Sequence, residues 1–242
     1  MLIAGNWKLN CNIKEAEDLS SSILNNLNHN SYKSEIAIFP PTIYIETVSN
    51  IIKNSNISLG AQDCSINISG AYTGDVSAPM LNDFGCKYSI VGHSERRNGK
   101  YESNKDVYLK AKNVMEYNMI PIICVGENAK DRDEGNALNI IKNQLDKSIP
   151  KINKEFIIAY EPIWAIGSGK IPTLDSINEM FNMIRQWLLN SGMNNNIKIL
   201  YGGSVNKGNA KELFSCKHLG GLLIGGVSLN PNEFSEICIM AS

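Results

Sequence analysis

Three side chains with complementary chemistry each come directly after an apolar run of the sequence. Glu161 follows FIIAY, His93 follows YSIVG and Lys8 follows LIAGNW, which also contains Asn6. A carboxylate can take a proton from carbon, an imidazole can donate a hydrogen bond to a carbonyl oxygen, and an ammonium can hold an anion. Together these types predict proton transfer on a small phosphorylated carbonyl compound.

Each of these groups also has a simpler explanation. Glu161 after an apolar strand would be partly desolvated, which raises the pKa towards that of a useful base, but it would serve equally as a strand-end ion pair. A histidine placed like His93 is commonly a hydrogen-bonded core residue. A helix beginning after it would instead disfavour the imidazolium and leave a neutral ring. Lys8, like most lysines, could lie on the surface.

Two glycine turns offer backbone N–H groups to an anion. Gly202–Ser204 follows the run IKILY, and the pair Gly225–Gly226 lies at the end of GLLIG. N–H groups at helix starts suit a phosphate, and barrels often bind phosphate after strands 7 and 8. The alternative is a pair of tight turns that need glycine. We expect no metal site, because the three histidines lie far apart with no HxxxH or HxH spacing.

These side chains need a scaffold of parallel strands whose ends meet. Eight short apolar runs suit strands buried on both faces. They cover residues 2–7, 36–39, 57–61, 88–92, 119–125, 156–160, 197–201 and 221–225. Amphipathic stretches lie between them, for example at 13–27, 104–118 and 174–190, the last with Thr173 or Asp175 as a possible N-cap.

The alternation predicts an α/β fold, either a closed (β/α)8 barrel or an open doubly wound sheet. No GxGxxG follows the first run, so the dinucleotide-binding sheet loses its main support. We therefore expect one barrel domain over residues 1–242. Two connections, 61–79 and 161–172, are long and contain glycine, which is typical of functional loops.

The composition excludes several classes of protein. The formal net charge is −1 with both signs mixed along the chain, which argues against a nucleic-acid or polybasic membrane partner. We find no signal peptide and no run of about 18 apolar residues. Six scattered cysteines with no CxxC pair indicate reduced thiols in a cytoplasmic protein.

Seven segments, taken together, resemble the triosephosphate isomerase family in order and approximate spacing. They are GNWKLN, GAYTGDVSAPML, VGHSERR, ICVGE, YEPIWAIGSGK, YGGSV and LIGGVSL, and they span nearly the whole chain. The resemblance implies cofactor-free interconversion of dihydroxyacetone phosphate and glyceraldehyde 3-phosphate. It implies Glu161 as the base, neutral His93 as the electrophile, and Lys8 and Asn6 as support for substrate and enediolate charge. The combination of a carboxylate base with a neutral imidazole is a known example, from this family, of pKa tuning by the environment.

The resemblance extends to further residues. It implies Glu95 near Lys8, Arg96 in an ion-pair network, and a homodimer in which the loop around Thr73 reaches the partner. The other implied residues contact phosphate or form a lid and its latch. The phosphate residues are Gly167, Ser204, Gly225 and Gly226; the lid is Pro162, Ile163, Trp164, Ala165, Ile166, Gly167, Ser168, Gly169 and Lys170, with Tyr201 and Ser204 as its latch.

One departure lies at Pro172, where many members carry a small residue; we hypothesise that proline leaves this hinge fewer open conformers. Other phosphate-binding barrels, such as a ribulose-phosphate epimerase or indole-glycerol-phosphate synthase, share the glycine turns but lack HSERR together with EPIWAIGSGK. A catalytically dead barrel kept as a scaffold would have lost its base, imidazole or lysine, and this chain keeps all three.

Overall fold

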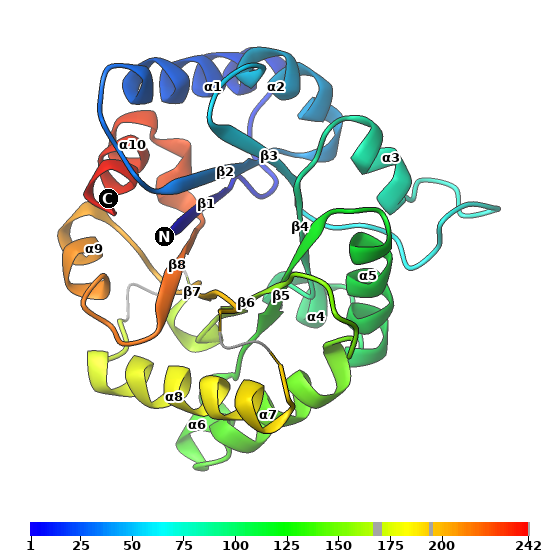
Figure 1. Ribbon diagram of the computed structural model, residues 1–242, viewed down its shortest axis with the longest axis vertical. Helices are drawn as coiled ribbons and strands as arrows, with labels where there is room; N and C mark the ends of the chain where they lie inside the picture. The colour runs from blue at the N-terminus through cyan, green and yellow to red at the C-terminus, as the bar shows by residue number, and fades with distance from the viewer. Residues whose placement is uncertain (167–170, 194–195, 242) are drawn as a thin grey trace.

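Eight parallel strands close into a barrel in the computed structural model, which describes residues 1–166, 171–193 and 196–241. Each strand pairs with the next along the chain, and β8 pairs with β1 (Figure 1). The strands are β1 Leu2–Asn6, β2 Glu35–Phe39, β3 Ile57–Ala61, β4 Tyr88–Val91, β5 Ile120–Val125, β6 Ile157–Tyr160, β7 Ile199–Tyr201 and β8 Leu219–Ile224. The predicted (β/α)8 barrel is confirmed, and the open sheet is excluded.

Helices surround the barrel on its outside (Figure 1). The α-helices are α1 Ile13–Asn28, α2 Ile45–Ile52, α3 Ala78–Asp83, α4 Ser94–Gly99, α5 Asn104–Glu116, α6 Ala129–Asp133, α7 Ala137–Ser148, α8 Leu174–Asn190, α9 Lys207–Leu213 and α10 Pro231–Met240. Short 3-10 turns are η1 Thr42–Tyr44, η2 Ile163–Ala165 and η3 Gly226–Leu229. Of the two caps considered for α8, the structure uses Thr173, whose hydroxyl accepts the Ser176 N–H.

Apolar side chains fill two separate layers. The barrel interior holds mostly small or branched residues with Phe39 and Tyr88 among them, and the larger layer lies between the strands and the helices. Gly60 on β3 shows how tightly the interior is filled, since a Cβ there would lie 2.2 Å from the Phe39 ring. A rigid, close-packed barrel fixes where each strand ends, and parallel strands bring all their carboxyl ends to one mouth.

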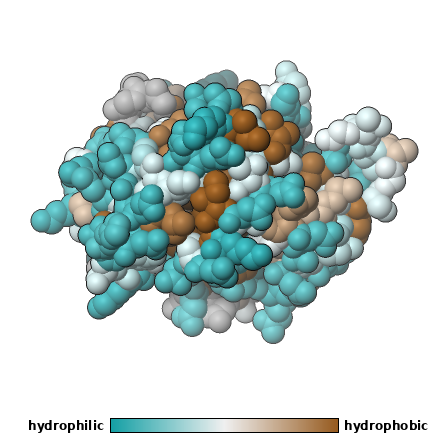
Figure 2. Space-filling model, turned by 90° about the horizontal axis from the view of Figure 1, so that it is seen from above, coloured by the Kyte–Doolittle hydropathy of each residue, from teal (hydrophilic) through white to brown (hydrophobic). Residues whose placement is uncertain are grey.

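The connection from β3 to α3 projects from the body of the molecule (Figures 1 and 2). Thr73 and its neighbours 70–75 are exposed. Large apolar side chains are exposed on this loop and on α3, namely Ile66, Ile68, Tyr72 and Met80. All six cysteines are free thiols, as predicted. Within the described ranges, the search for a helix long and apolar enough to cross a membrane finds none.

Candidate active site

A cavity of about 220 Å³ opens at the mouth formed by the carboxyl ends of the strands. The sequence placed its candidate residues on separate strand ends, and the fold brings them around this one cavity. Its lining includes Asn6, Lys8, His93, Glu161, Ile166, Gly202, Gly203, Ser204, Val205, Leu223, Gly225, Gly226 and Val227. Among the described residues, no group of three or more His, Cys, Asp and Glu side chains could hold a metal ion.

Glu161 is fixed at the first position after β6. Its N–H donates to the Val125 carbonyl oxygen over 2.8 Å, which continues the ladder between β5 and β6. The approach is close enough that a Cβ on Gly126 would lie 2.0 Å from the Glu161 carbonyl oxygen, so glycine is required there. The side chain is 1% exposed, and Oε2 accepts the Ser94 N–H at the start of α4 over 2.9 Å. The carboxylate is therefore buried and held in one orientation by a backbone hydrogen bond.

His93 faces this carboxylate as the N-cap of α4. Its Nδ1 accepts the Glu95 N–H over 3.2 Å, so the proton of the neutral ring lies on Nε2. Nε2 lies 2.9 Å from Glu161 Oε1. The two atoms are in contact without good hydrogen-bond alignment, because Oε1 has no hydrogen-bond partner among the described residues. The imidazole nitrogen expected to donate to a carbonyl oxygen therefore lies against the Glu161 carboxylate, and both side chains line the cavity.

The contact between the two side chains changes the expected protonation. Burial acts to raise the pKa of Glu161, but His93, the Ser94 N–H and Lys8 together lower it below its ordinary value. Burial acts to lower the pKa of His93, but the Glu161 carboxylate and Glu95 raise it. The expectation of a raised pKa for Glu161 is not met in this arrangement, and the pKa of His93 is raised and not lowered, because the contact between the two side chains outweighs the desolvation of each.

Lys8 is held in a strained conformation by three neighbours. Its φ of 54° lies in the left-handed region, which costs a non-glycine residue about 1–3 kcal/mol. Its N–H donates to Asn6 Oδ1 over 3.0 Å, its carbonyl oxygen accepts Gln62 Nε2 over 2.8 Å, and its Nζ lies 2.6 Å from Glu95 Oε1. The Lys8 ammonium therefore lines the cavity rather than the open surface, and Glu95 lies beside it as predicted.

The glycine turns after β7 and β8 form the opposite wall. A Cβ on Gly225 would lie 3.1 Å from Lys8 Cε, and one on Gly202 would lie 3.0 Å from Glu161 Cγ. Gly226 begins η3, and both Gly225 and Gly226 line the cavity that Lys8 also lines. Ser204 Oγ donates to the Ala165 carbonyl oxygen over 2.6 Å, which joins the β7 turn to η2. Tyr201 is fully buried, and its hydroxyl has no partner within the described ranges.

The segment after Glu161 is anchored by a residue that the sequence reading did not select. Glu127 accepts Trp164 Nε1 over 2.9 Å, Arg132 NH1 over 2.8 Å and the Tyr160 hydroxyl over 3.1 Å, all at Oε1. Its carbonyl oxygen also accepts the Ile163 N–H. Glu127 stands two residues after β5, so the rule that selected Glu161 could have found it. The predicted Gly167, Ser168, Gly169 and Lys170 lie outside the described residues.

Arg96 takes part in an ion-pair cluster, as the resemblance implied. Its guanidinium lies 2.7 Å from Asp63 and 2.5 Å from Glu102. Asp63, Glu102 and their shared partner Lys110 were not selected from the sequence, because the contacts join residues 47 and 8 positions apart that carry no local motif. Thr73 is exposed on the connection from β3 to α3 and does not line the cavity of its own chain.

The barrel and its cavity define a class: a (β/α)8 enzyme equipped for proton transfer on an anionic substrate. The family model for triosephosphate isomerase matches residues 1–241. The chain is 40% identical over 244 residues to triosephosphate isomerase of Vesicomyosocius okutanii, covering 98% of each chain. It is 39% identical over 241 residues to that of Legionella pneumophila (strain Paris), covering 98% of this chain and 96% of the relative.

A solved structure gives the same result. The crystal structure of triosephosphate isomerase from Bartonella henselae superimposes with a TM-score of 0.89 at 34% identity, covering 99% of this chain and 98% of that one. The chain belongs to the triosephosphate isomerase family.

Proposed function

We propose that this chain catalyses the reaction of its family, the interconversion of dihydroxyacetone phosphate and D-glyceraldehyde 3-phosphate in glycolysis and gluconeogenesis. Glu161 moves the proton between adjacent carbons through an enediolate, and no cofactor takes part. The observation that supports this role is the position of Glu161 Oε1, buried, without a hydrogen-bond partner among the described residues and 2.9 Å from His93 Nε2 beside the cavity.

The substrate would separate the two side chains. Its carbonyl oxygen would accept the Nε2 proton of His93, and the carbon next to it would face Glu161. Without the imidazole in contact, burial becomes the dominant influence and raises the pKa of Glu161 towards that of a useful base. His93 in turn loses the carboxylate contact that raises its pKa. Binding would thereby convert a resting ion pair into a base and a neutral hydrogen-bond donor.

Lys8 and the glycine turns would bind the charged end of the substrate. The Lys8 ammonium can balance both the phosphate and the enediolate, with the Asn6 side chain fixing the Lys8 backbone. Ser204, Gly225 and Gly226 would contribute mainly N–H groups to the phosphate, together with Gly167. Pro162 to Lys170 would act as a lid that excludes water, with Tyr201 and Ser204 as its latch.

One coupled assay tests the assignment of the base. We expect the purified protein to convert glyceraldehyde 3-phosphate into dihydroxyacetone phosphate, and Glu161→Asp to lose about 10²-fold in turnover because the carboxylate retracts by one methylene. Glu155→Asp is the matched control, since this exposed residue stands just before β6, at its other end. Equal losses in both variants would refute the role of Glu161, and no turnover in the folded wild type would refute the function.

We also propose a cytoplasmic homodimer in which the loop around Thr73 contacts the partner near Lys8. The projecting loop with its exposed apolar side chains and the six free thiols support this. Sedimentation should give twice the chain mass. Thr73→Glu should shift the protein towards monomer and lower its activity, whereas Asn153→Glu, at an exposed position before β6, should leave the dimer intact. An unshifted Thr73→Glu protein would argue against this interface.

A further inference from the structure

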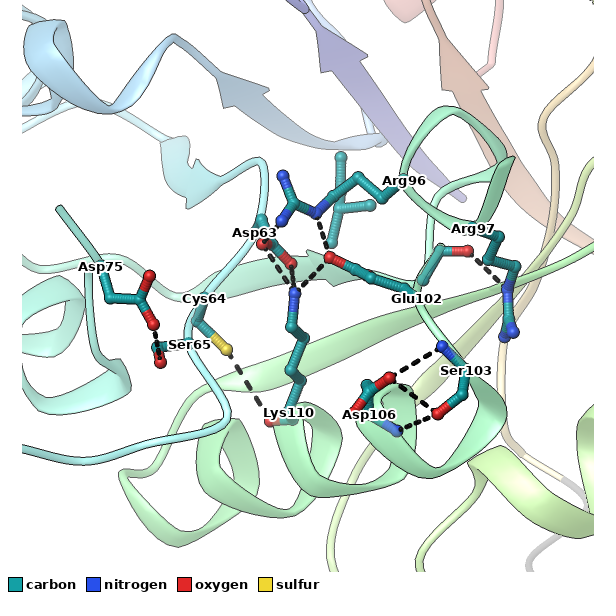
Figure 3. Close-up of polar contacts among 12 residues, drawn as sticks. Asp63, Cys64, Ser65, Asp75, Arg96, Arg97, Glu102, Ser103, Asp106 and Lys110 are labelled. Carbon is teal, nitrogen blue, oxygen red and sulfur yellow. Dashed lines mark hydrogen bonds and ion pairs between the residues drawn. The ribbon is translucent and has the colours of Figure 1, made fainter. Parts of the chain in front are cut away.

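Two acidic and two basic side chains meet between the end of β3 and the helices α4 and α5 (Figure 3). Lys110 Nζ lies 2.8 Å from both oxygens of Asp63 and 2.6 Å from Glu102 Oε1. Arg96 approaches from the other side and reaches Asp63 Oδ2 over 2.7 Å and Glu102 Oε1 over 2.5 Å. We call these four residues the Asp63 cluster.

The Asp63 cluster is a set of mutually paired charges, three of which are poorly solvated. The Lys110 and Glu102 side chains are 6% and 8% exposed, and that of Asp63 is 19% exposed. Glu102 Oε2 is buried without a hydrogen-bond partner in the described ranges. Two carboxylates therefore balance two cations, and removing one negative charge leaves an excess positive charge that water reaches mainly at the Arg96 side chain, which is 36% exposed.

The residue before Asp63 holds the backbone of Lys8. Gln62 Nε2 donates to the Lys8 carbonyl oxygen over 2.8 Å and to the Phe39 carbonyl oxygen over 2.9 Å. Lys8 needs such a restraint because its positive φ is unfavourable for a lysine. The direction of the Gln62 side chain also depends on where the chain is fixed after it, and the ion pairs of Asp63 fix the very next residue.

The cluster also reaches Lys8 from the opposite side. Arg96 follows Glu95 in the first turns of α4, and Glu95 Oε1 lies 2.6 Å from Lys8 Nζ. The ion pairs from Arg96 to Asp63 and Glu102 therefore help to fix the turn that carries Glu95, together with the hydrogen bonds that Arg97 donates to backbone carbonyl oxygens. Lys8 is restrained at its carbonyl oxygen through Gln62 and at its ammonium through Glu95, and both restraints lead back to Asp63.

We infer that Asp63 is a positioning residue, which holds the Lys8 ammonium in the cavity through Gln62 and Glu95 and releases it in part on taking up a proton. The inference rests on the proposed role of Lys8 in binding the substrate. Neither Arg96 nor Lys110, the ion-pair partners of Asp63, lines the active-site cavity, so the effect of Asp63 is on the placement of Lys8 and not on the chemical step.

The protonation needed for this release falls in an accessible range. Burial, with Glu102 acting in the same direction, raises the pKa of Asp63 to about 6 against the opposing effects of Lys110 and Arg96. The Asp63 cluster lines a second cavity, of about 360 Å³, separate from the candidate active site. The other acidic groups in its lining, Asp75 and Asp106, are bonded to Ser65 and Ser103. The nearest thiol, Cys64, has its pKa raised to about 12 by burial and by Asp63, and it stays protonated.

Asp63→Asn tests the inference because it imitates the protonated side chain at nearly constant volume. At pH 8 we expect KM to rise about threefold to tenfold, the usual effect of removing one member of a polar network, with kcat within about twofold. The substrate phosphate also titrates near pH 6. The decisive quantity is therefore the ratio of wild-type to variant kcat/KM, in which that titration cancels. The ratio should fall towards one as the pH drops through about 6.

Asp106→Asn is the matched control, since it makes the same chemical change at the same cavity, and Asp106 bonds to Ser103 without an ion pair to any of the four residues of the Asp63 cluster. Its ratio should stay near one at every pH. Gln62→Met removes the two hydrogen bonds of Gln62 and should raise KM at pH 8 by a similar factor.

A ratio for Asp63→Asn that is independent of pH, or a loss confined to kcat, would overturn the inference. Normal substrate affinity in Gln62→Met would do the same even if Asp63→Asn did not fold. Absence of turnover in the wild type would instead remove the proposed function.

Discussion

Glu161 and Glu127 are both buried glutamates at the carboxyl ends of neighbouring strands, β6 and β5, and they are used differently. Glu161 is 1% exposed and Glu127 is 0% exposed. Three side-chain donors, including the Arg132 guanidinium, converge on Glu127 Oε1. Glu161 receives one backbone N–H, faces a titratable imidazole and lines a cavity, which Glu127 does not.

The difference separates a structural carboxylate from a reactive one at equal burial. A buried charge must be compensated, and for Glu127 the protein supplies a permanent cation and two further donors. For Glu161 part of the compensation comes from His93, a group that can itself give up its charge. Burial and position after a strand therefore do not distinguish the two, whereas the chemistry of the partners and the adjoining cavity do.

The largest expected effect is the loss of activity in Glu161→Gln. Removing the base should lower kcat by about 10²- to 10⁴-fold, because an amide cannot accept the proton. Glu127→Gln, assayed under the same conditions, should lose much less, since Glu127 lies outside the cavity. Comparable losses of kcat in the two variants would mean that the comparison assigns their roles wrongly. Circular dichroism should show that the Glu161→Gln barrel is folded.

The second expected effect concerns stability, and here we expect the larger loss for the Glu127 variant. Glu127→Gln should lower the free energy of unfolding by about 2 kcal/mol, less than the 3–5 kcal/mol of a fully buried pair because the Arg132 side chain is 26% exposed. Urea denaturation would measure it. Glu161→Gln should cost less, since its pairing with His93 can be relieved by deprotonating the imidazole. A larger loss of stability for Glu161→Gln would contradict this assignment.

A third, smaller effect is the pH dependence of the pair formed by Glu161 and His93. The pKa of Glu161 is lowered, so its contribution to stability is present above about pH 4.3 and is lost as the pH falls through the lowered value. The pKa of His93 is raised, so its contribution is complete below about pH 6.5 and is lost as the pH rises through the raised value. The pair is therefore most stabilising between these limits.

Comparison of the wild type with His93→Asn measures this window. The difference in their unfolding free energies should be larger at pH 5.5 than at pH 8.5. Other groups that titrate in this range, Asp63 among them, contribute equally to both proteins and cancel. A difference that grows as the pH rises would show that the imidazole is neutral in the folded protein and that the two side chains do not pair.

Much of the scaffold could be predicted because burial on both faces leaves a strong local pattern. All eight apolar runs became strands, mostly within one residue, and Thr173 caps α8. The run at 197–201 shortens to Ile199–Tyr201, where the pairing with β8 changes register between Ile199 and Leu200. Such a shift depends on the neighbouring strand and leaves no mark in the run itself.

The candidate active site could also be predicted only in part. Glu161, His93 and Lys8 could be selected because each stands alone at a strand end, and a closed barrel must bring those ends together. Their protonation could not be predicted, because it depends on a 2.9 Å contact between side chains 68 positions apart in the chain. For the same reason the sequence did not point to Asp63 and Lys110, because their role depends on the ion pair between them.

The smallest expected effect concerns the two ends of the segment that follows Glu161. Its first end is fixed by Glu127, which holds both Ile163 and Trp164. At its other end Pro172 is buried directly before Thr173, the cap of α8, so a proline ring restricts the backbone there. Proline also restricts Ile171 before it.

Pro172→Ala should therefore lower the free energy of unfolding by about 0.4–1 kcal/mol, because the unfolded chain gains conformers. The freer end should also change turnover or substrate affinity by less than tenfold, since opening and closing set the rate in many enzymes with lids. Steady-state kinetics against Glu155→Asp would measure it. If neither turnover nor affinity changes, the proline does not restrict the hinge, and the anchoring at Glu127 is sufficient on its own.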